Sequence, residues 1–264
     1  MFLNKKRLLV AITTFNHDAL RVSIPLLARI GHRVSVLIYN DNPDIKLTKK
    51  TVRKIGWRGP LQIINGAENL GEIGAKIKLI DICAKDTTHK WVTFMDDDDM
   101  LVSIDIPQVS DDVFAILQNV AVVQDSHTEL FKKHFDWNKN SLGPNFDIRG
   151  TWIRPMYLDG FSNFMESLMP QFNKIARVLK YRLPVGAILW AGLNAFVKST
   201  HPKMQPIYMN KTNYVSIRLG TACEKYGTKN SPSDVRADFS KAALEKFTEL
   251  FDFAIKQNVV AQEQ

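Results

Sequence analysis

The first hundred residues alternate between two hydrophobic patterns. Short, mostly apolar runs of the kind found in strands buried on both faces of a sheet occur at intervals along the chain. These runs are Leu8–Ile12, Val34–Tyr39, Leu61–Ile64 and Trp91–Met95, with Val120–Val123 as a fifth. Between them, residues 19–30 and 72–84 carry apolar side chains at helical spacing. This succession predicts the α/β class, with a Rossmann-like, mostly parallel central sheet flanked by helices.

The second half of the chain is less regular. Residues 161–180 and 239–256 have helical patterns, and the apolar stripe of the second helix is expected to pack on the domain. We also predict a strand over residues 194–198 and a helix over residues 214–226. The expected organisation is a single domain with two halves, residues 1–132 and 133–231, followed by a C-terminal helical segment, residues 232–264.

Composition narrows the class of protein, and the charge is unevenly placed. Of the 264 residues, 45% are hydrophobic and 23% charged, which are globular values. Two cysteines exclude a disulfide framework and a cysteine-rich zinc site, so we expect a cytoplasmic protein. No apolar stretch reaches the roughly 20 residues of a membrane-spanning helix. The formal net charge is +8, and residues 133–264 carry most of it, with 18 Lys+Arg against 11 Asp+Glu. That surplus indicates either solubility alone or an anionic partner.

Four consecutive aspartates, Asp96 to Asp99, directly follow the predicted strand at Trp91–Met95. In an open α/β sheet, ligands bind beyond the carboxyl ends of the strands. Adjacent carboxylates repel one another, and a divalent cation removes that cost. Oxygen ligands with no neighbouring histidine or cysteine favour Mg²⁺ or Mn²⁺. The alternative is a solvated acidic loop without a ligand.

Polar and aromatic residues also follow the other predicted strands. Thr13, Thr14 and Phe15 end the first strand, and Asp41 ends the second. After the third strand, residues 69–76 (Asn-Leu-Gly-Glu-Ile-Gly-Ala-Lys) open a helix whose N-terminus favours anions. Together, these strand ends suit a nucleoside diphosphate held with a metal ion.

The same four segments resemble motifs of GT-A type glycosyltransferases, most closely the family 2 group. The matching segments are Ile12–Asn16 for Ile-Pro-Thr-Tyr-Asn, residues 40–42 for Asp-Asp-Gly or Asp-Asp-Asn, Asn69-x-Gly71 with Ala75-Lys76 for Asn-x-Gly with Ala-Arg, and Phe94–Asp99 for Phe-Leu-Asp-x-Asp-Asp. Their order and spacing agree over a little more than a third of the chain. Thr13 stands in place of the usual proline, and Lys76 stands in place of the usual arginine. The bidentate hydrogen bonding of an arginine is therefore lost at Lys76.

The resemblance implies a role for each segment and makes residues 1–132 the donor half. Thr14, Phe15 and Asp41 would hold the base, Lys76 would approach the diphosphate, and Asp96 would contact the ribose or the sugar. The expected donor-binding residues are Thr13, Thr14, Phe15, Asp41, Asn69, Gly71, Lys76, Asp96 and Asp97. The expected metal-binding residues are Asp98 and Asp99, with Mn²⁺ or Mg²⁺ as the ion and a UDP-sugar as the donor.

The reaction can also require a general base, which activates the acceptor hydroxyl. Inverting enzymes need a carboxylate to take the acceptor's proton. The carboxylates of the acceptor half between residues 150 and 223 are Asp159 and Glu166, and we expect Asp159, then Glu166, as the base. A retaining mechanism would need no such base.

Residues 133–231 would face the acceptor, and they hold 14 Lys+Arg against five Asp+Glu. Basic residues interleaved with aromatics suit hydroxymethylated DNA bases, as in phage-type DNA modification. They also suit lipopolysaccharide or another surface glycan at a membrane surface. A nucleic-acid-binding protein with an inactive transferase fold is the alternative from another class. A nucleotidyltransferase is disfavoured, because no glycine-rich loop follows the first strand.

Overall fold

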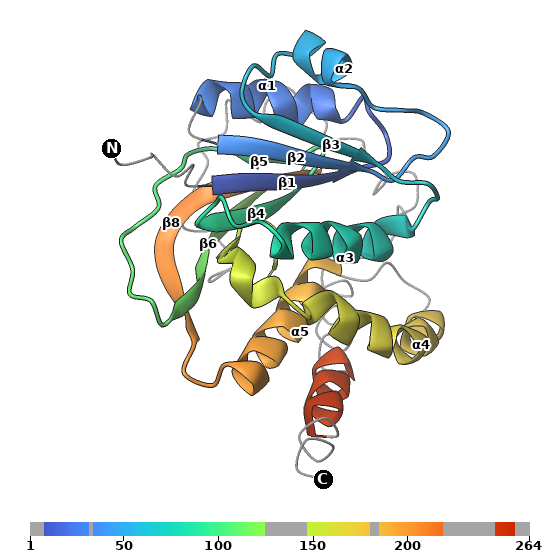
Figure 1. Ribbon diagram of the computed structural model, residues 1–264, viewed down its shortest axis with the longest axis vertical. Coiled ribbons are helices and arrows are strands. Elements are labelled where there is room, and N and C mark those ends of the chain that lie inside the picture. Colours follow the sequence, from blue (N-terminus) through green and yellow to red (C-terminus); the bar gives the residue numbers. More distant parts are fainter. Residues whose placement is uncertain (1–7, 32–33, 125–146, 180–184, 219–245, 257–264) are drawn as a thin grey trace.

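Eight strands form one curled sheet with helices on both faces (Figure 1), within the residues that the computed structural model describes, 8–31, 34–124, 147–179, 185–218 and 246–256. The elements in chain order are β1 (Leu8–Thr14), α1 (Leu20–Ile30), β2 (Val34–Asn40), α2 (Lys49–Lys54), β3 (Leu61–Asn65), α3 (Gly71–Ala84), β4 (Trp91–Asp96), β5 (Met100–Leu101), β6 (Val113–Gln124), β7 (Trp152–Ile153), the 3-10 helix η2 (Pro155–Leu158), α4 (Phe161–Leu179), α5 (Val185–Thr200) and β8 (Gln205–Arg218). The predicted α/β class is confirmed.

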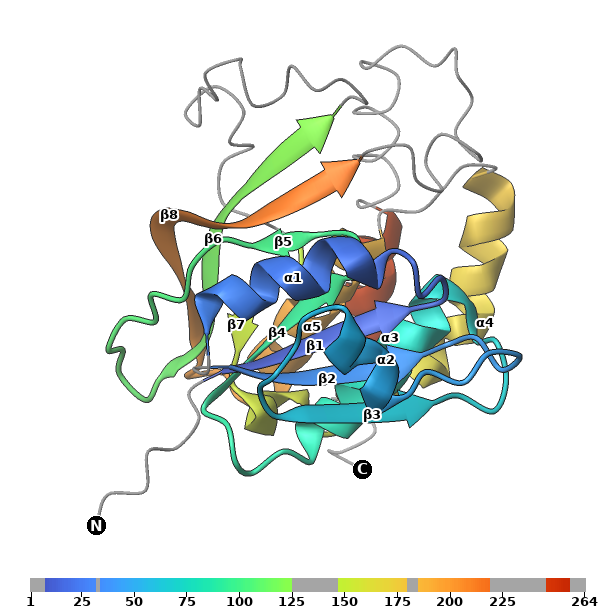
Figure 2. The ribbon, with the colours of Figure 1, turned by 90° about the horizontal axis from the view of Figure 1, so that it is seen from above.

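The strand order is β3-β2-β1-β4-β7-β6-β8-β5. The first four strands in this order are parallel, so their carboxyl ends meet at one edge of the sheet. The two-residue strand β7 is antiparallel to both of its neighbours, β4 and β6. Beyond it, β6 and β8 pair in parallel along most of their length, and they lie side by side in both views (Figures 1 and 2).

Two hydrophobic clusters pack on opposite faces of the parallel strands. Alternate residues of β1 enter different clusters: Val10 packs with α1 and α2, and Ala11 packs with α3. Every residue of β1 except Thr13 is buried, as its continuous apolar run predicts. Figure 1 shows α1 and α2 on one side of these strands and α3 on the other, with α4 and α5 beyond α3.

Residues 246–256 form a helix that packs on α4 and α5, drawn in red in Figure 1. The ring of Phe247 contacts that of Phe172 of α4 at an interplanar angle of 34°, with centroids 4.4 Å apart. Phe251 lies 6.2 Å from the ring of Phe164 and closely approaches Gly192 of α5. This agrees with the packing expected of a helix over residues 239–256, of which 239–245 lie outside the described part.

Two predicted elements are wrong. Residues 194–198, predicted as a strand, belong to α5, where residues such as Leu189, Leu193 and Val197 are buried at helical spacing. Residues 214–218, the start of the predicted helix 214–226, belong to β8. β-branched Thr212, Val215 and Ile217 favour a strand there. The rest of that segment lies outside the described residues.

The longest apolar stretch of the sequence, residues 183–197, coincides with α5 in its described part. It packs in the cluster beneath the sheet with buried residues such as Ile188 and Trp190. None of the helices in the described ranges combines the length and the apolar character needed to cross a membrane.

Candidate functional site

Strand register brings the predicted donor-binding residues to one edge. Thr13 of β1 pairs with Asp96 of β4, and Thr14 pairs with Asn40 of β2. The N–H of Asp41 then donates to the carbonyl of Thr14 at 2.8 Å. Residues from three separate motifs therefore lie beside one another because parallel strands end at the same edge.

Asp96, the first aspartate of the acidic run, lies between two cations. Its Oδ1 is 2.6 Å from Nζ of Lys76, and its Oδ2 accepts from Nη1 of Arg149 at 2.9 Å. Burial would raise the pKa of Asp96, but the charges of Lys76 and Arg149 outweigh it and hold that pKa below its ordinary value. Nζ of Lys76 also lies 3.6 Å from Oε1 of Glu72. The charge of Lys76 is therefore already paired with two carboxylates of the protein.

Asp97 and Asp99 have a different electrostatic environment. Asp97 accepts a hydrogen bond from Oγ1 of Thr14 at 2.6 Å, and Asp99 accepts one from the hydroxyl of Tyr214. Burial, reinforced by the neighbouring aspartates, raises the pKa of each carboxyl to about 7. Burial, more than the neighbouring charges, therefore disfavours ionisation of these two carboxyls.

Arg149 and Tyr214 are site residues that the sequence reasoning missed. Arg149 grips Asp147 through Nε at 3.0 Å and Nη2 at 2.7 Å, while its Nη1 reaches Asp96 and lies 3.9 Å from Asp99. One guanidinium therefore joins three carboxylates. Its position depends on Gly150, whose N–H donates to the carbonyl of Phe94 in β4. No motif marks Arg149, whereas the alternation of apolar and polar residues over 215–218, directly after Tyr214, is a usable strand signal.

The end of β2 forms the second part of the edge. Asp41, 4% exposed, accepts a 2.9 Å hydrogen bond from the N–H of Leu70. Burial raises the pKa of Asp41, and hydrogen bonds from the N–H groups of Leu70 and Gly71 oppose that rise. Asn69 accepts from the N–H of Gly71, whose φ of 69° suits glycine in this turn. Phe15 is 52% exposed and leaves an aromatic ring open at this edge.

The acidic run suits a hard divalent cation only in part. Asp96 pairs with Lys76 and Arg149, whereas burial, with the charges of neighbouring aspartates added to it, disfavours ionisation of Asp97 and Asp99. Among the described residues, no group of three or more His, Cys, Asp or Glu side chains is arranged to hold a metal ion. The residues therefore fit an ion that takes one or two carboxylates and completes its shell with phosphate and water.

The structure does not bring Asp159 and Glu166 to the acidic run. Because β7 is antiparallel to β4, the chain after it leads toward the amino end of β4. Asp159 follows η2 there and is exposed, as is Glu166 in α4. Ser162, which lies between them in sequence, contacts Asp81 of α3. Asp81 is ten residues after Gly71, where α3 begins beside the acidic run. At the rise of a helix, that places Asp81 about 15 Å from the edge that holds the acidic run. Their role as general base stays a prediction, with no support from position.

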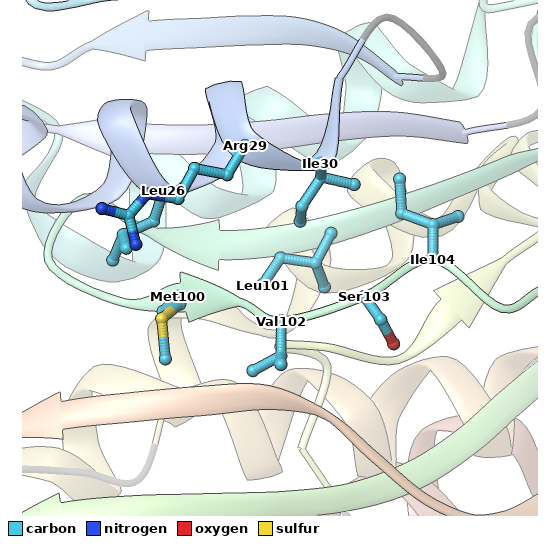
Figure 3. Close-up of a pocket in the computed structure, with 8 residues that line it drawn as sticks. All are labelled: Leu26, Arg29, Ile30, Met100, Leu101, Val102, Ser103 and Ile104. Carbon is cyan, nitrogen blue, oxygen red and sulfur yellow. The ribbon is translucent and has the colours of Figure 1, made fainter. Parts of the chain in front are cut away.

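A shallow cavity of about 420 Å³ lies beside the site (Figure 3). Its walls come from α1 and from the segment that follows Asp99, and its lining is mostly apolar: Leu26, Arg29, Ile30, Met100, Leu101, Val102, Ser103 and Ile104. It contains none of the carboxylates of the acidic run. Chemistry at the sheet edge is therefore separate from this cavity.

Removing the charge of Asp97 tests the cost of ionising this buried carboxyl. Asp97→Asn is expected to stabilise the fold by about 2 kcal/mol at pH 8 and by little at pH 4. The reason is that the raised pKa keeps the folded carboxyl protonated at low pH, whereas the unfolded one ionises near pH 4. Stability of the parent protein should therefore fall between pH 4 and 7 relative to the variant. Urea unfolding across that range measures this, and a constant difference would contradict the assignment.

Comparisons with known proteins give fold neighbours alone. No protein-family model matches the chain, and no curated protein matches it. The structure is similar to that of S. aureus TarS 1-349, with 14% identity and a TM-score of 0.46, covering 80% of this chain and 60% of that one. A second TarS structure has 14% identity and a TM-score of 0.47, covering 80% of this chain and 37% of that one. At these values the likeness concerns the fold and not the activity.

Proposed function

We propose that the chain is a glycosyltransferase that moves a sugar from a nucleotide-diphosphate donor to a hydroxyl acceptor. The observation that carries the proposal is the single hydrogen-bonded edge formed by the ends of β1, β2 and β4. Thr14 bonds Asp97, Lys76 bonds Asp96, and Asp41 bonds the backbone that opens α3. These residues come from all four motifs that resemble the glycosyltransferase donor site.

Different residues of the edge would bind different parts of the donor. An exposed aromatic ring at Phe15 and the buried carboxylate of Asp41 would recognise the base, for which uracil is our expectation. Arg149, whose side chain is 24% exposed, would meet the diphosphate. Lys76 is paired with Asp96 and Glu72 and would hold Asp96 in position. Asp98, which is partly exposed, would hold Mn²⁺ or Mg²⁺ with Asp99 beside it. When bound, that ion would act as a Lewis acid on the leaving diphosphate.

The proposed acceptor is a hydroxyl group. The described residues give no support to DNA as the acceptor. The basic half on which that expectation depends, residues 133–231, includes residues 133–146, 180–184 and 219–231, which lie outside the described part. A glycan hydroxyl stays compatible with the site, and so does a nucleic-acid sugar or base hydroxyl.

Donor binding is tested by thermal unfolding with UDP-, GDP- and dTDP-linked sugars, each with and without Mn²⁺. A donor at 100 times its dissociation constant stabilises a fold by about 2.7 kcal/mol, which should raise the melting temperature by about 5 °C or more. Release of free nucleotide over time then measures turnover. If no nucleotide sugar stabilises the protein or is turned over, the proposed function is wrong.

The metal assignment has a separate test. Asp98→Asn should abolish the Mn²⁺-dependent part of the stabilisation and the turnover, while Asp105→Asn, at an exposed aspartate paired with Lys211, should change neither. Equal behaviour of the two variants would show that Asp98 holds no metal, without touching the donor assignment.

A further inference from the structure

Residues 46–58, here called the basic segment, form a concentrated positive surface around α2. The segment holds six cations and no acid, and all six are exposed: Lys46, Lys49, Lys50, Arg53, Lys54 and Arg58. Within the described residues, no carboxylate forms an ion pair with any of them. Arg58 instead donates to the carbonyls of Arg53 and Trp57 and keeps its charge.

The fold presents these cations on one side of the segment. Leu47, Val52 and Trp57 are 0–2% exposed and pack in the cluster that covers this face of the sheet. Thr48 caps α2 by accepting from the N–H of Thr51 at 3.1 Å. With the apolar side fixed inward, the cations stand together toward solvent.

The basic segment is also tied to the candidate donor edge. Nδ2 of Asn40 donates to the carbonyl of Ile45 at 2.8 Å, and Oδ1 of Asn65 accepts from the N–H of Leu47 at 2.8 Å. Asn40 immediately precedes Asp41. The loop that begins at the donor edge therefore leads directly into the basic segment, and it carries Ile45 with 56% of its surface exposed.

We propose that the basic segment docks the protein on an anionic membrane surface, with Ile45 entering the lipid interface. A cation held at such a surface strengthens binding by about fivefold, so six unpaired cations favour this partner. An exposed aliphatic side chain beside the cations suits a lipid interface. Binding to single-stranded nucleic acid would favour exposed rings for stacking, and the segment's one aromatic residue, Trp57, is 1% exposed.

Docking would hold the donor edge close to the membrane. The docking itself requires no catalytic activity, but its consequence for the acceptor rests on the proposed function. An acceptor carried by a lipid or by the membrane surface would then meet the site, in place of the hydroxymethylated DNA base considered from the sequence.

The test is cosedimentation of the full chain with phosphatidylcholine vesicles that contain no or 30% phosphatidylglycerol. We expect binding to the anionic vesicles alone, weakened by salt. Lys49→Glu with Lys50→Glu should weaken it at least tenfold, and these glutamates favour the dipole of α2, so the variant should fold. The matched control, Lys174→Glu with Lys203→Glu, makes the same charge change on α4 and before β8, away from α2 in Figure 1.

Three further results decide the proposal. Ile45→Trp should show a blue-shifted emission with anionic vesicles if residue 45 enters the lipid. Equal loss in both double variants would mean that net charge alone acts and would overturn the proposal. Tighter binding to duplex DNA than to anionic vesicles, lost with Lys49→Glu and Lys50→Glu, would assign the segment to nucleic acid instead. Donor stabilisation, measured without vesicles, tests the proposed function separately.

Discussion

Replacing Gly150 with alanine is expected to lower the free energy of unfolding by about 3 kcal/mol. Gly150 has a φ of 70°, and an added Cβ would lie 2.6 Å from Cγ of Tyr214. The methyl group therefore combines a strained backbone with a clash against a fully buried ring. Because Tyr214 donates to Asp99 and Gly150 is bonded to Phe94 of β4, relief of the clash must disturb the acidic run. Urea unfolding measures the loss, and donor stabilisation should disappear with it.

Gly160→Ala is the matched control. Gly160 has a similar φ of 77°, but its added Cβ would meet Phe196 at 3.4 Å, an ordinary contact. It should cost about 1–2 kcal/mol, from the backbone alone. If both variants lose equal stability, the contact with Tyr214 contributes nothing and the site is less rigid than its geometry indicates.

The half of the fold that holds the donor edge could be predicted from the sequence because its strands are buried on both faces. Such strands appear in the sequence as short continuous apolar runs, as at Leu8–Ile12 and Trp91–Met95. These runs are readily told apart from the helical spacing of the segments between them. The runs end close to the observed strand ends, since polar residues follow each of them. By contrast, β7 has two residues, too few for any pattern. The segment at 194–198 was misread because a short apolar run in a buried helix has no distinguishing period.

Site residues that lie within continuous sequence motifs could be predicted, and those that strand pairing brings to the site could not. The four aspartates and Lys76 sit in recognisable motifs, and strand register then places them together. Arg149 lies 50 residues after Asp99 and reaches it only because β7 pairs between β4 and β6. Its neighbour Asp147 gives no signal, since one acid two residues before an arginine is common in loops. Asp159 was expected from composition, and strand direction places it at the other edge.

Replacing Arg149 with methionine should have the largest effect on the site. The variant leaves Asp96, Asp99 and Asp147 without their shared cation, and the side chain of Asp99 is 2% exposed. Breaking a buried ion pair by removing one partner costs about 3–5 kcal/mol. Because 24% of the Arg149 side chain is exposed, we expect the lower end, about 3 kcal/mol. Arg149→Lys keeps the charge without the bidentate grip and should recover part of it.

The pH dependence of that loss separates electrostatics from packing. Arg149 opposes the rise in the pKa of Asp99, so without it the folded carboxyls bind protons at still higher pH. A carboxyl whose pKa is raised in the folded state makes the fold less stable as the pH rises from about 4. The stability lost in Arg149→Met should therefore be smaller at about pH 5 than at about pH 8. Arg154→Met is the control, because Arg154 packs on Trp91 and pairs with the fully exposed Asp111. The control should lose the same stability at both pH values. A loss in Arg149→Met that is also equal at the two pH values would show that Arg149 contributes through packing alone.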